Sequence, residues 1–233
     1  MLVSHNPVVV AEADEFDRSF HQLFPSIAVI TAMDAGHLDI YGDLEHVQES
    51  FRIFASQVSD FLIIKKGLPV SSTDTKARIL TYHYDDPEAD FHSTNVRLDR
   101  LGRYTFDLVY PEGVIKDITP GALGWVNIEN SVAAMAMAWL NGVTKEEIRV
   151  GISSFAGVWR RFNILINRPD LAYVDDYTRI FLLRRLLYGQ GAAAGCYHHD
   201  RHEGGCQHYF FHHGKDNHLF SIFALLWKVR PQG

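Results

Sequence analysis

The sequence has little of what a disulfide-bonded, a membrane-spanning or a nucleic-acid-binding protein needs. Cysteine occurs twice in 233 residues, at Cys196 and Cys206, so no disulfide framework holds the fold and a reducing compartment is expected. No apolar run approaches the roughly 20 residues that span a bilayer, and the first residues have no basic segment followed by a signal-peptide core. The 22 basic and 28 acidic residues give a net charge of −6, and no basic run interleaves with aromatics. We therefore expect a soluble, cytoplasmic protein that neither inserts into a membrane nor binds nucleic acid.

The hydrophobic residues that are present, 47% of the chain, are enough for one large domain or two small ones. Short apolar, β-branched runs at 7–11, 27–31 and 61–64 are typical of strands buried on both faces. Residues 44–57 carry apolar side chains at helical spacing. This alternation predicts an α/β fold, in which helices flank a mainly parallel sheet.

The second half of the chain carries different local signals. Short alternating runs between 78 and 110, separated by turns, favour antiparallel strands. The Ala- and Met-rich segment 127–140 predicts a helix that ends at Gly142, and Thr144 with Glu147 predicts a capping box at the start of the next helix. A further strand is expected at 172–176, where the run ends in acids.

Polar side chains follow two of the predicted strands. Glu12 and His37 come just after the first and second strands, which we expect to be adjacent and parallel, and an open α/β sheet binds its ligands at that edge. Carboxylate oxygen suits Mg²⁺, although an imidazole beside it is less usual. The alternative is that Asp14, Glu15 and Asp17 cap the following helix and that His37 is an ordinary loop residue.

Five motifs occur along the chain, at residues 12–20 (EADEFDRSF), 37–43 (HLDIYGD), 127–130 (NIEN), 157–162 (GVWRRF) and 175–177 (DDY). In order and spacing they resemble those of the Mur ligases that add L-alanine to UDP-N-acetylmuramate. The resemblance extends over residues 7–177 and implies an ATP-dependent amide-bond ligase of peptidoglycan precursor synthesis. In such an enzyme the muramate carboxylate is phosphorylated by ATP and the amine of L-alanine then attacks it.

The resemblance also implies roles for individual residues, with ATP and Mg²⁺ as cofactors. Metal and guanidinium groups that meet the charge of the transferring phosphoryl supply most of the catalysis in such reactions, and an Asn amide offers adenine a donor and an acceptor. The implied roles are Mg²⁺ ligation by Glu12 and His37, adenine binding by Asn127 and Asn130, a position near the ATP phosphates for Arg161, and a position close to the nucleotide for Asp176.

Each of these assignments has a structural alternative. Asn127 is also a good N-cap for the helix that follows it. Arg160 and Arg161 could be a solvated pair on a linker, and Asp175 and Asp176 could cap a turn.

The chain departs from the family in what it lacks. It contains neither the Gly-rich phosphate loop, GTxGKS or GTxGKT, nor the UDP-binding domain that precedes that loop in the family. We therefore expect an incomplete central domain over residues 1–158 and the start of a C-terminal domain over 159–233, inactive by itself. Smaller departures are Gly36, Val126 and Asn163, which stand where the family usually has Asp, His and an acid.

After Tyr177 the family pattern stops, and the tail becomes rich first in Arg and Leu and then in Gly, His and Cys. The abrupt change inside a motif suggests a shifted reading frame, which would make the C-terminal domain partial or aberrant. The rival interpretation is a zinc site, because thiolate and imidazole are zinc ligands, although the Cys spacing matches no common zinc module. Its candidate ligands are Cys196, His198, His199, His202, Cys206, His208, His212 and His213.

Two alternatives to the alanine-adding ligase therefore stay open. One is the related ligase that joins murein tripeptide to UDP-N-acetylmuramate during recycling, which shares the acidic and Asn motifs. The other is a non-catalytic protein whose tail binds a metal.

Overall fold

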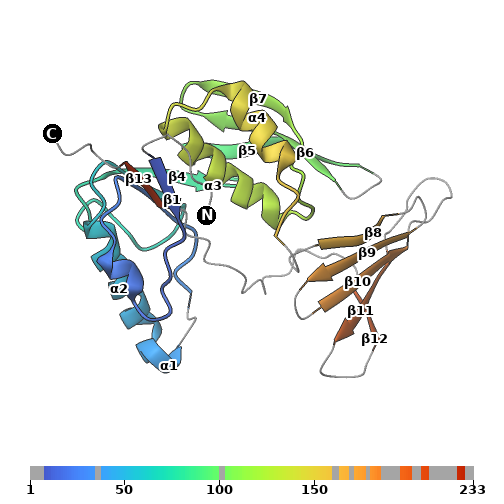
Figure 1. Cartoon of the computed structure of the whole chain (residues 1–233), viewed down its shortest axis with the longest axis horizontal. Coiled ribbons are helices and arrows are strands. Elements are labelled where there is room, and N and C mark those ends of the chain that lie inside the picture. Colours follow the sequence, from blue (N-terminus) through green and yellow to red (C-terminus); the bar gives the residue numbers. More distant parts are fainter. Residues whose placement is uncertain are drawn as a thin grey trace.

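The computed structural model describes residues 8–34, 38–99 and 103–158, with backbone alone at 38–39, and the backbone of the strands within 163–228 (Figure 1). The elements of the first hundred residues are β1 (Val8–Ala11), η1 (Ser19–Gln22), β2 (Ile27–Ile30), α1 (Leu38–Tyr41), α2 (Leu44–Ser56), β3 (Phe61–Lys65), β4 (Arg78–His83) and β5 (Phe91–Leu98). The later elements are β6 (Tyr104–Tyr110), β7 (Gly113–Ile118), α3 (Val126–Leu140), α4 (Lys145–Ser154), β8 (Asn163–Asn167), β9 (Leu171–Asp176), β10 (Arg179–Arg184), β11 (Gly195–Asp200), β12 (Cys206–Tyr209) and β13 (Leu225–Lys228).

The main sheet has eight strands in the order β1-β13-β2-β3-β4-β5-β6-β7. Its centre is parallel, from β2 through β3 and β4 to the first residues of β5. β5, β6 and β7 form an antiparallel end. β13 is antiparallel to both β1 and β2, so β1 and β2 run in the same direction. Strands β8 to β12 form a second, antiparallel sheet (Figure 1).

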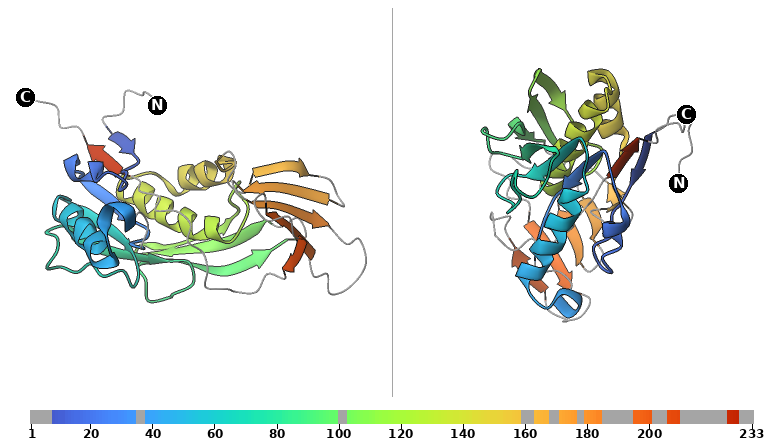
Figure 2. Two further views of the ribbon diagram at one scale, coloured as in Figure 1. Left: turned by 90° about the horizontal axis from the view of Figure 1, so that it is seen from below. Right: turned by 90° about the vertical axis from the view of Figure 1, so that its left-hand side faces the viewer.

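Helices cover the two faces of the parallel strands, which confirms the predicted α/β fold. On one face Val29 and Ile63 pack with α3, and on the other Ile30 and Leu62 pack with α2 and Phe20. Figure 2 shows α2 and α3 on opposite sides of the sheet. Because successive residues of a strand face opposite sides, β2 and β3 must be apolar at almost every position.

The ends of the helices follow their local signals. The N–H of Gly142 (φ 75°) donates to Trp139 O and that of Val143 donates to Ala138 O, which is the Schellman arrangement at the end of α3. Thr144 and Glu147 form the predicted capping box at the start of α4. Both predictions are confirmed.

The prediction of antiparallel strands between 78 and 110 is right for β5 and β6 but wrong for β4. β4 lies parallel to β3, with Leu62 opposite Ile79 and Ile64 opposite Thr81. Its alternating pattern has another cause, because Leu80 and Tyr82 are buried under α3 while the residues between them are only partly covered on the other face. The alternating pattern therefore reflects how unevenly the two faces of β4 are covered, and it does not indicate the direction of the strand.

A buried carboxylate organises the antiparallel end of the sheet. Asp107 on β6 accepts a hydrogen bond from the side-chain amide of Asn95 (2.8 Å) and another from the backbone N–H of Asp117 (2.8 Å). Asn95 and Asp117 have positive φ and lie at irregularities in the strand pairing. These hydrogen bonds, above all that from Asn95, hold the pKa of Asp107 below its ordinary value.

No helix in the described ranges is long and apolar enough to cross a membrane. The predicted strand at 172–176 is confirmed as β9, and strands β10 to β12 follow it. The boundary between domains at 158 stays a prediction, although β13 returns from the tail to the first sheet.

Candidate functional site

The candidate site lies at the edge of the main sheet where the parallel strands end. β1, β2 and β3 run the same way, so Glu12, the segment after Ile30, and Lys65 share this edge. The expectation that β1 and β2 are adjacent is wrong, because β13 lies between them. At about 4.8 Å per neighbouring strand, this places β1 roughly 10 Å from β2.

The structure brings the first two motifs together at this edge. Tyr41 of α1 is buried, its hydroxyl donates to the backbone carbonyl of Glu15, and the Arg18 guanidinium lies 4.9 Å from its ring centre. Residues 12–20 are therefore fixed against the segment that follows His37. The side chain of His37 lies outside the described residues, so its metal-binding role is not tested.

The acids of the first motif have different surroundings. Asp14 accepts the N–H of Phe16 (2.9 Å), and Asp17 accepts the N–H of Ser19 (2.8 Å) at the start of η1. The N-cap of η1 is Arg18, so the capping alternative is not confirmed for Asp17, although its carboxylate accepts the first N–H of that helix. The pKa of Asp17 is lowered mainly by the hydrogen bonds from Ser19. Glu12 is exposed and has no hydrogen bond or ion pair within the described ranges. Its carboxylate fits the oxygen donor that Mg²⁺ takes from a protein.

Asn127 and Asn130 lie together in the first turn of α3. The Asn127 amide donates to Leu123 O (2.5 Å), and its own oxygen faces the Asn130 amide nitrogen at 3.5 Å. The N-cap alternative for Asn127 is wrong, because α3 begins at Val126 and its N-cap is Trp125. The Asn130 amide therefore keeps its carbonyl oxygen and one N–H for a base, as far as the described residues show.

An ion pair connects this turn to the edge of the sheet. Lys65, the last residue of β3, lies with its Nζ 3.0 Å from Oε2 of Glu129. Next to it, the ring of Tyr84 lies 5.5 Å from that of Trp125. Burial, with a smaller contribution from the Glu129 charge, raises the pKa of the Tyr82 hydroxyl well above its ordinary range. This ion pair puts the Asn pair at the same edge as Glu12.

The remaining predicted residues are not tested. Arg161, together with Arg160, lies outside the described residues, and Asp176 is described only as the last backbone position of β9, opposite Arg179. In the tail, β11 and β12 pair with His199 opposite Cys206, but their side chains are not described. No group of three or more His, Cys, Asp or Glu that could hold a metal occurs within the described ranges.

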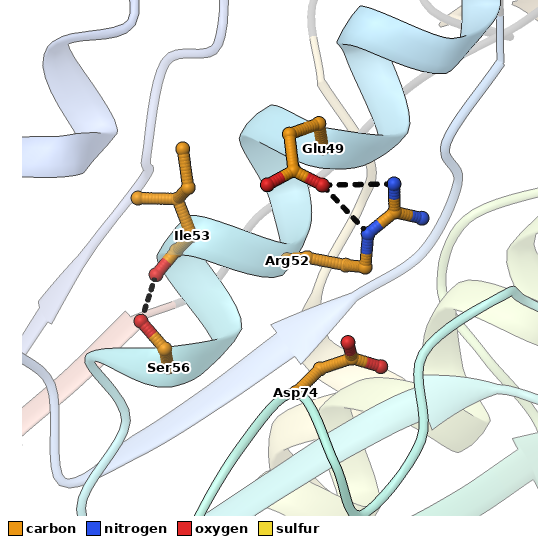
Figure 3. A pocket seen from close by; sticks show the side chains of 5 residues that line it. All are labelled: Glu49, Arg52, Ile53, Ser56 and Asp74. Carbon is orange, nitrogen blue, oxygen red and sulfur yellow. Dashed lines mark hydrogen bonds and ion pairs between the residues drawn. The ribbon is translucent and has the colours of Figure 1, made fainter.

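A shallow hollow of about 250 Å³ lies elsewhere, on the outer side of α2 (Figure 3). An exposed ion pair between Glu49 and Arg52 forms part of its wall, and Asp74 faces it from the loop before β4. It contains none of the predicted site residues, and exposed ion pairs of this kind contribute little. The hollow is not a candidate for the active site.

Comparison with known proteins decides the family. The model of the Mur ligase middle domain matches residues 3–138. The chain belongs to the Mur ligase family. Proteins named UDP-N-acetylmuramate–L-alanine ligase are 43% identical to it in Porphyromonas gingivalis and 46% identical in Parabacteroides distasonis. Each of these matches covers 76% of this Mur ligase chain, and the chain spans about two fifths of the relatives' length, 39% and 38%.

Solved structures agree on the fold. The UDP-N-acetylmuramate-alanine ligase MurC from Thermotoga maritima aligns with a TM-score of 0.59 and 19% identity, over 71% of this chain and 37% of that one. MurF from Acinetobacter baumannii aligns with a TM-score of 0.58 and 21% identity, over 69% and 36%. At such identities these likenesses show a shared Mur ligase fold and no more.

Sequence reasoning missed two residues of the site in this Mur ligase chain, Lys65 and Glu129. Lys65 is a cation at the end of an apolar strand, and Glu129 stands between the two Asn residues of a helix that is otherwise Ala-rich. The available signal was a charged residue at the end of one apolar segment and inside the other. Their pairing across 64 residues had no signal in the sequence.

Proposed function

We propose that this chain forms part of the ATP-binding region of a ligase that adds L-alanine to UDP-N-acetylmuramate in cytoplasmic peptidoglycan precursor synthesis. The observation that carries the proposal is the 43–46% identity to proteins named for that reaction, together with the position of the Glu12 carboxylate and the Asn amides at the same edge of the sheet. ATP with Mg²⁺ would supply the phosphoryl group that activates the muramate carboxylate.

Three of the described residues, Glu12, Asn127 and Asn130, have chemistry that this function would use. Glu12, exposed and unpaired within the described ranges, would hold the Mg²⁺ ion, with His37 as its second protein ligand. The fixed amides of Asn127 and Asn130 would bind the adenine edge by one donor and one acceptor. Arg161 would neutralise phosphate charge and Asp176 would approach the nucleotide, as the family resemblance implies.

The sequence has no GTxGKS or GTxGKT loop, so no backbone cradle for the β- and γ-phosphates comes from these 233 residues. We therefore propose that the chain alone binds nucleotide weakly, depends on Mg²⁺ for this binding, and does not ligate. Ligation would need residues that these relatives have and this sequence does not.

Calorimetric titration of the 233-residue chain with ATP, with and without Mg²⁺, tests the proposal. We expect Glu12→Gln to remove the Mg²⁺ dependence and Asn127→Ala to weaken ATP binding about tenfold, which corresponds to 1.4 kcal/mol. Glu49→Gln on α2 is a matched control that should change neither. Tight binding of ATP without Mg²⁺, or binding that neither variant alters, contradicts the proposal.

The choice of amino acid requires a longer polypeptide that carries the phosphate loop. A polypeptide that contains both the phosphate loop and these 233 residues should release phosphate from ATP when L-alanine and UDP-N-acetylmuramate are present. A preference for murein tripeptide over L-alanine would instead assign the chain to the recycling ligase.

A further inference from the structure

The ion pair between Lys65 and Glu129 joins the sheet to the first turn of α3 in a setting where such a pair is costly. The Glu129 side chain is 11% exposed and that of Lys65 is 35% exposed. The Oε1 atom of Glu129 is buried and has no hydrogen-bond partner within the described ranges. The carboxylate therefore depends on Lys65 for its stabilisation.

Stability alone does not account for this arrangement. The rest of α3 is held by apolar packing, with Val132, Met135 and Ala136 buried against the sheet. Replacing a buried ion pair by apolar residues of similar size is often neutral or stabilising, whereas removing one partner is harmful. What a charged pair adds to apolar packing is direction, because a charge-assisted hydrogen bond fixes its two groups more narrowly in distance and angle than a methyl contact does.

The ion pair therefore bears on the orientation of the two Asn side-chain amides in the same turn. Asn127 and Asn130 are three residues apart, so they project from neighbouring positions of the turn that contains Glu129. Asn127 is fixed by Leu123 O and in turn faces Asn130. A shift or rotation of this turn relative to β3 would move both amides together.

We propose that Lys65 and Glu129 are positioning residues that hold the first turn of α3 in the register at which Asn127 and Asn130 distinguish adenine from guanine. The inference rests on the proposed function, because it assumes that these amides meet the base. Adenine presents an amino donor where guanine presents a carbonyl acceptor, so discrimination depends on where the amide oxygen and N–H lie. Neither Lys65 nor Glu129 needs to touch the nucleotide.

The test compares variants of the 233-residue chain for binding of Mg·ATP, Mg·GTP and magnesium tripolyphosphate by calorimetry. Lys65→Met removes the cation, Glu129→Gln keeps the shape without the charge, and Lys65→Met/Glu129→Leu replaces the pair by apolar groups. Lys66→Met is the matched control, because the neighbouring Lys66 pairs with Asp86 and Glu88 instead of α3. Thermal unfolding followed by circular dichroism identifies the variants that are folded.

We expect the wild-type chain and Lys66→Met to prefer ATP over GTP by about tenfold, the scale of one well-placed amide contact. In the folded double variant and in Glu129→Gln the preference should fall to within about twofold, with tripolyphosphate binding unchanged, an effect that lost stability alone does not produce. If the wild type prefers ATP, Asn127→Ala abolishes this preference and the double variant retains it, the positioning role is refuted and the proposed function stands. If the wild type shows no preference for ATP, the adenine site is refuted and the positioning role with it.

Discussion

The loop that leads into α3 touches the end of α4 at Gly121, and a single methyl group there should push the loop and the helix apart. The N–H of Gly121 donates to Ile152 O at 3.1 Å. A Cβ atom built on Gly121 would lie 2.6 Å from both Phe155 O and Ser153 O. Both obstacles are backbone atoms, so no side chain can rotate out of the way.

The magnitude follows from this overlap. A Cβ atom needs more than 3.0 Å from a carbonyl oxygen, so the loop and the end of α4 must separate by about half an ångström or more, and overpacking of this kind costs about 1–3 kcal/mol. Weakening the hydrogen bond to Ile152 adds about 1 kcal/mol, and the less flexible unfolded chain returns about 0.5 kcal/mol. We expect Gly121→Ala to lower the free energy of unfolding by about 1.5–3.5 kcal/mol.

Urea unfolding followed by circular dichroism measures this change, and in thermal unfolding the melting temperature should fall by about 3–14 °C. Gly151→Ala is the matched control, because Gly151 lies inside α4 and its Cβ would meet nothing within 4 Å. That variant should gain up to about 1 kcal/mol from helix propensity. A Gly121→Ala protein within about 0.5 kcal/mol of the wild type would refute the close approach of the loop and α4.

Three further substitutions test other parts of the fold. Asp107→Asn should lower the free energy of unfolding by about 1–3 kcal/mol. Since the pKa of Asp107 is lowered in the folded protein, its contribution to the free energy of unfolding is complete above the unfolded pKa of about 3.9 and is lost as the pH falls through the folded pKa. The acid unfolding curve of the variant should not show this loss. Thr144→Ala should cost about 0.5–2 kcal/mol and bring the lowered pKa of Glu147, measured by NMR titration, back toward its ordinary value, because the Thr144 side chain is the main cause of the shift. Tyr41→Phe should cost about 1 kcal/mol, and an unchanged melting temperature would show that its bond to Glu15 O does not hold the first motif.

Much of the fold could be predicted because its signals are local. The apolar runs at 27–31 and 61–64 became β2 and β3, and the segment 127–140 became α3 with one residue added at its start. Helix caps such as Thr144 depend on residues within one turn, so the sequence contains all the information they need. The motifs that indicate a Mur ligase are likewise short and continuous.

For the candidate site, the sequence identified residues but not their partners. It pointed to Glu12, Asn127 and Asn130, yet it suggested Asn127 as a helix cap, which the structure contradicts. An Asn before an Ala-rich run favours an N-cap locally, but the start of a helix also depends on the loop that enters it.

The sequence by itself determined β2, β3, α2 and α3, the capping box of α4, and to which family the chain belongs. Its prediction that the run 7–11 is buried on both faces is wrong, because Val9 and Val10 of β1 are exposed. Only the tertiary structure decided that β4 runs parallel to β3, that β13 separates β1 from β2, and that Lys65 meets Glu129. The physical reason is range. Periodicity and capping reflect neighbours within a few residues, whereas strand direction, strand order and ion pairs between distant segments depend on how the whole chain buries its apolar surface.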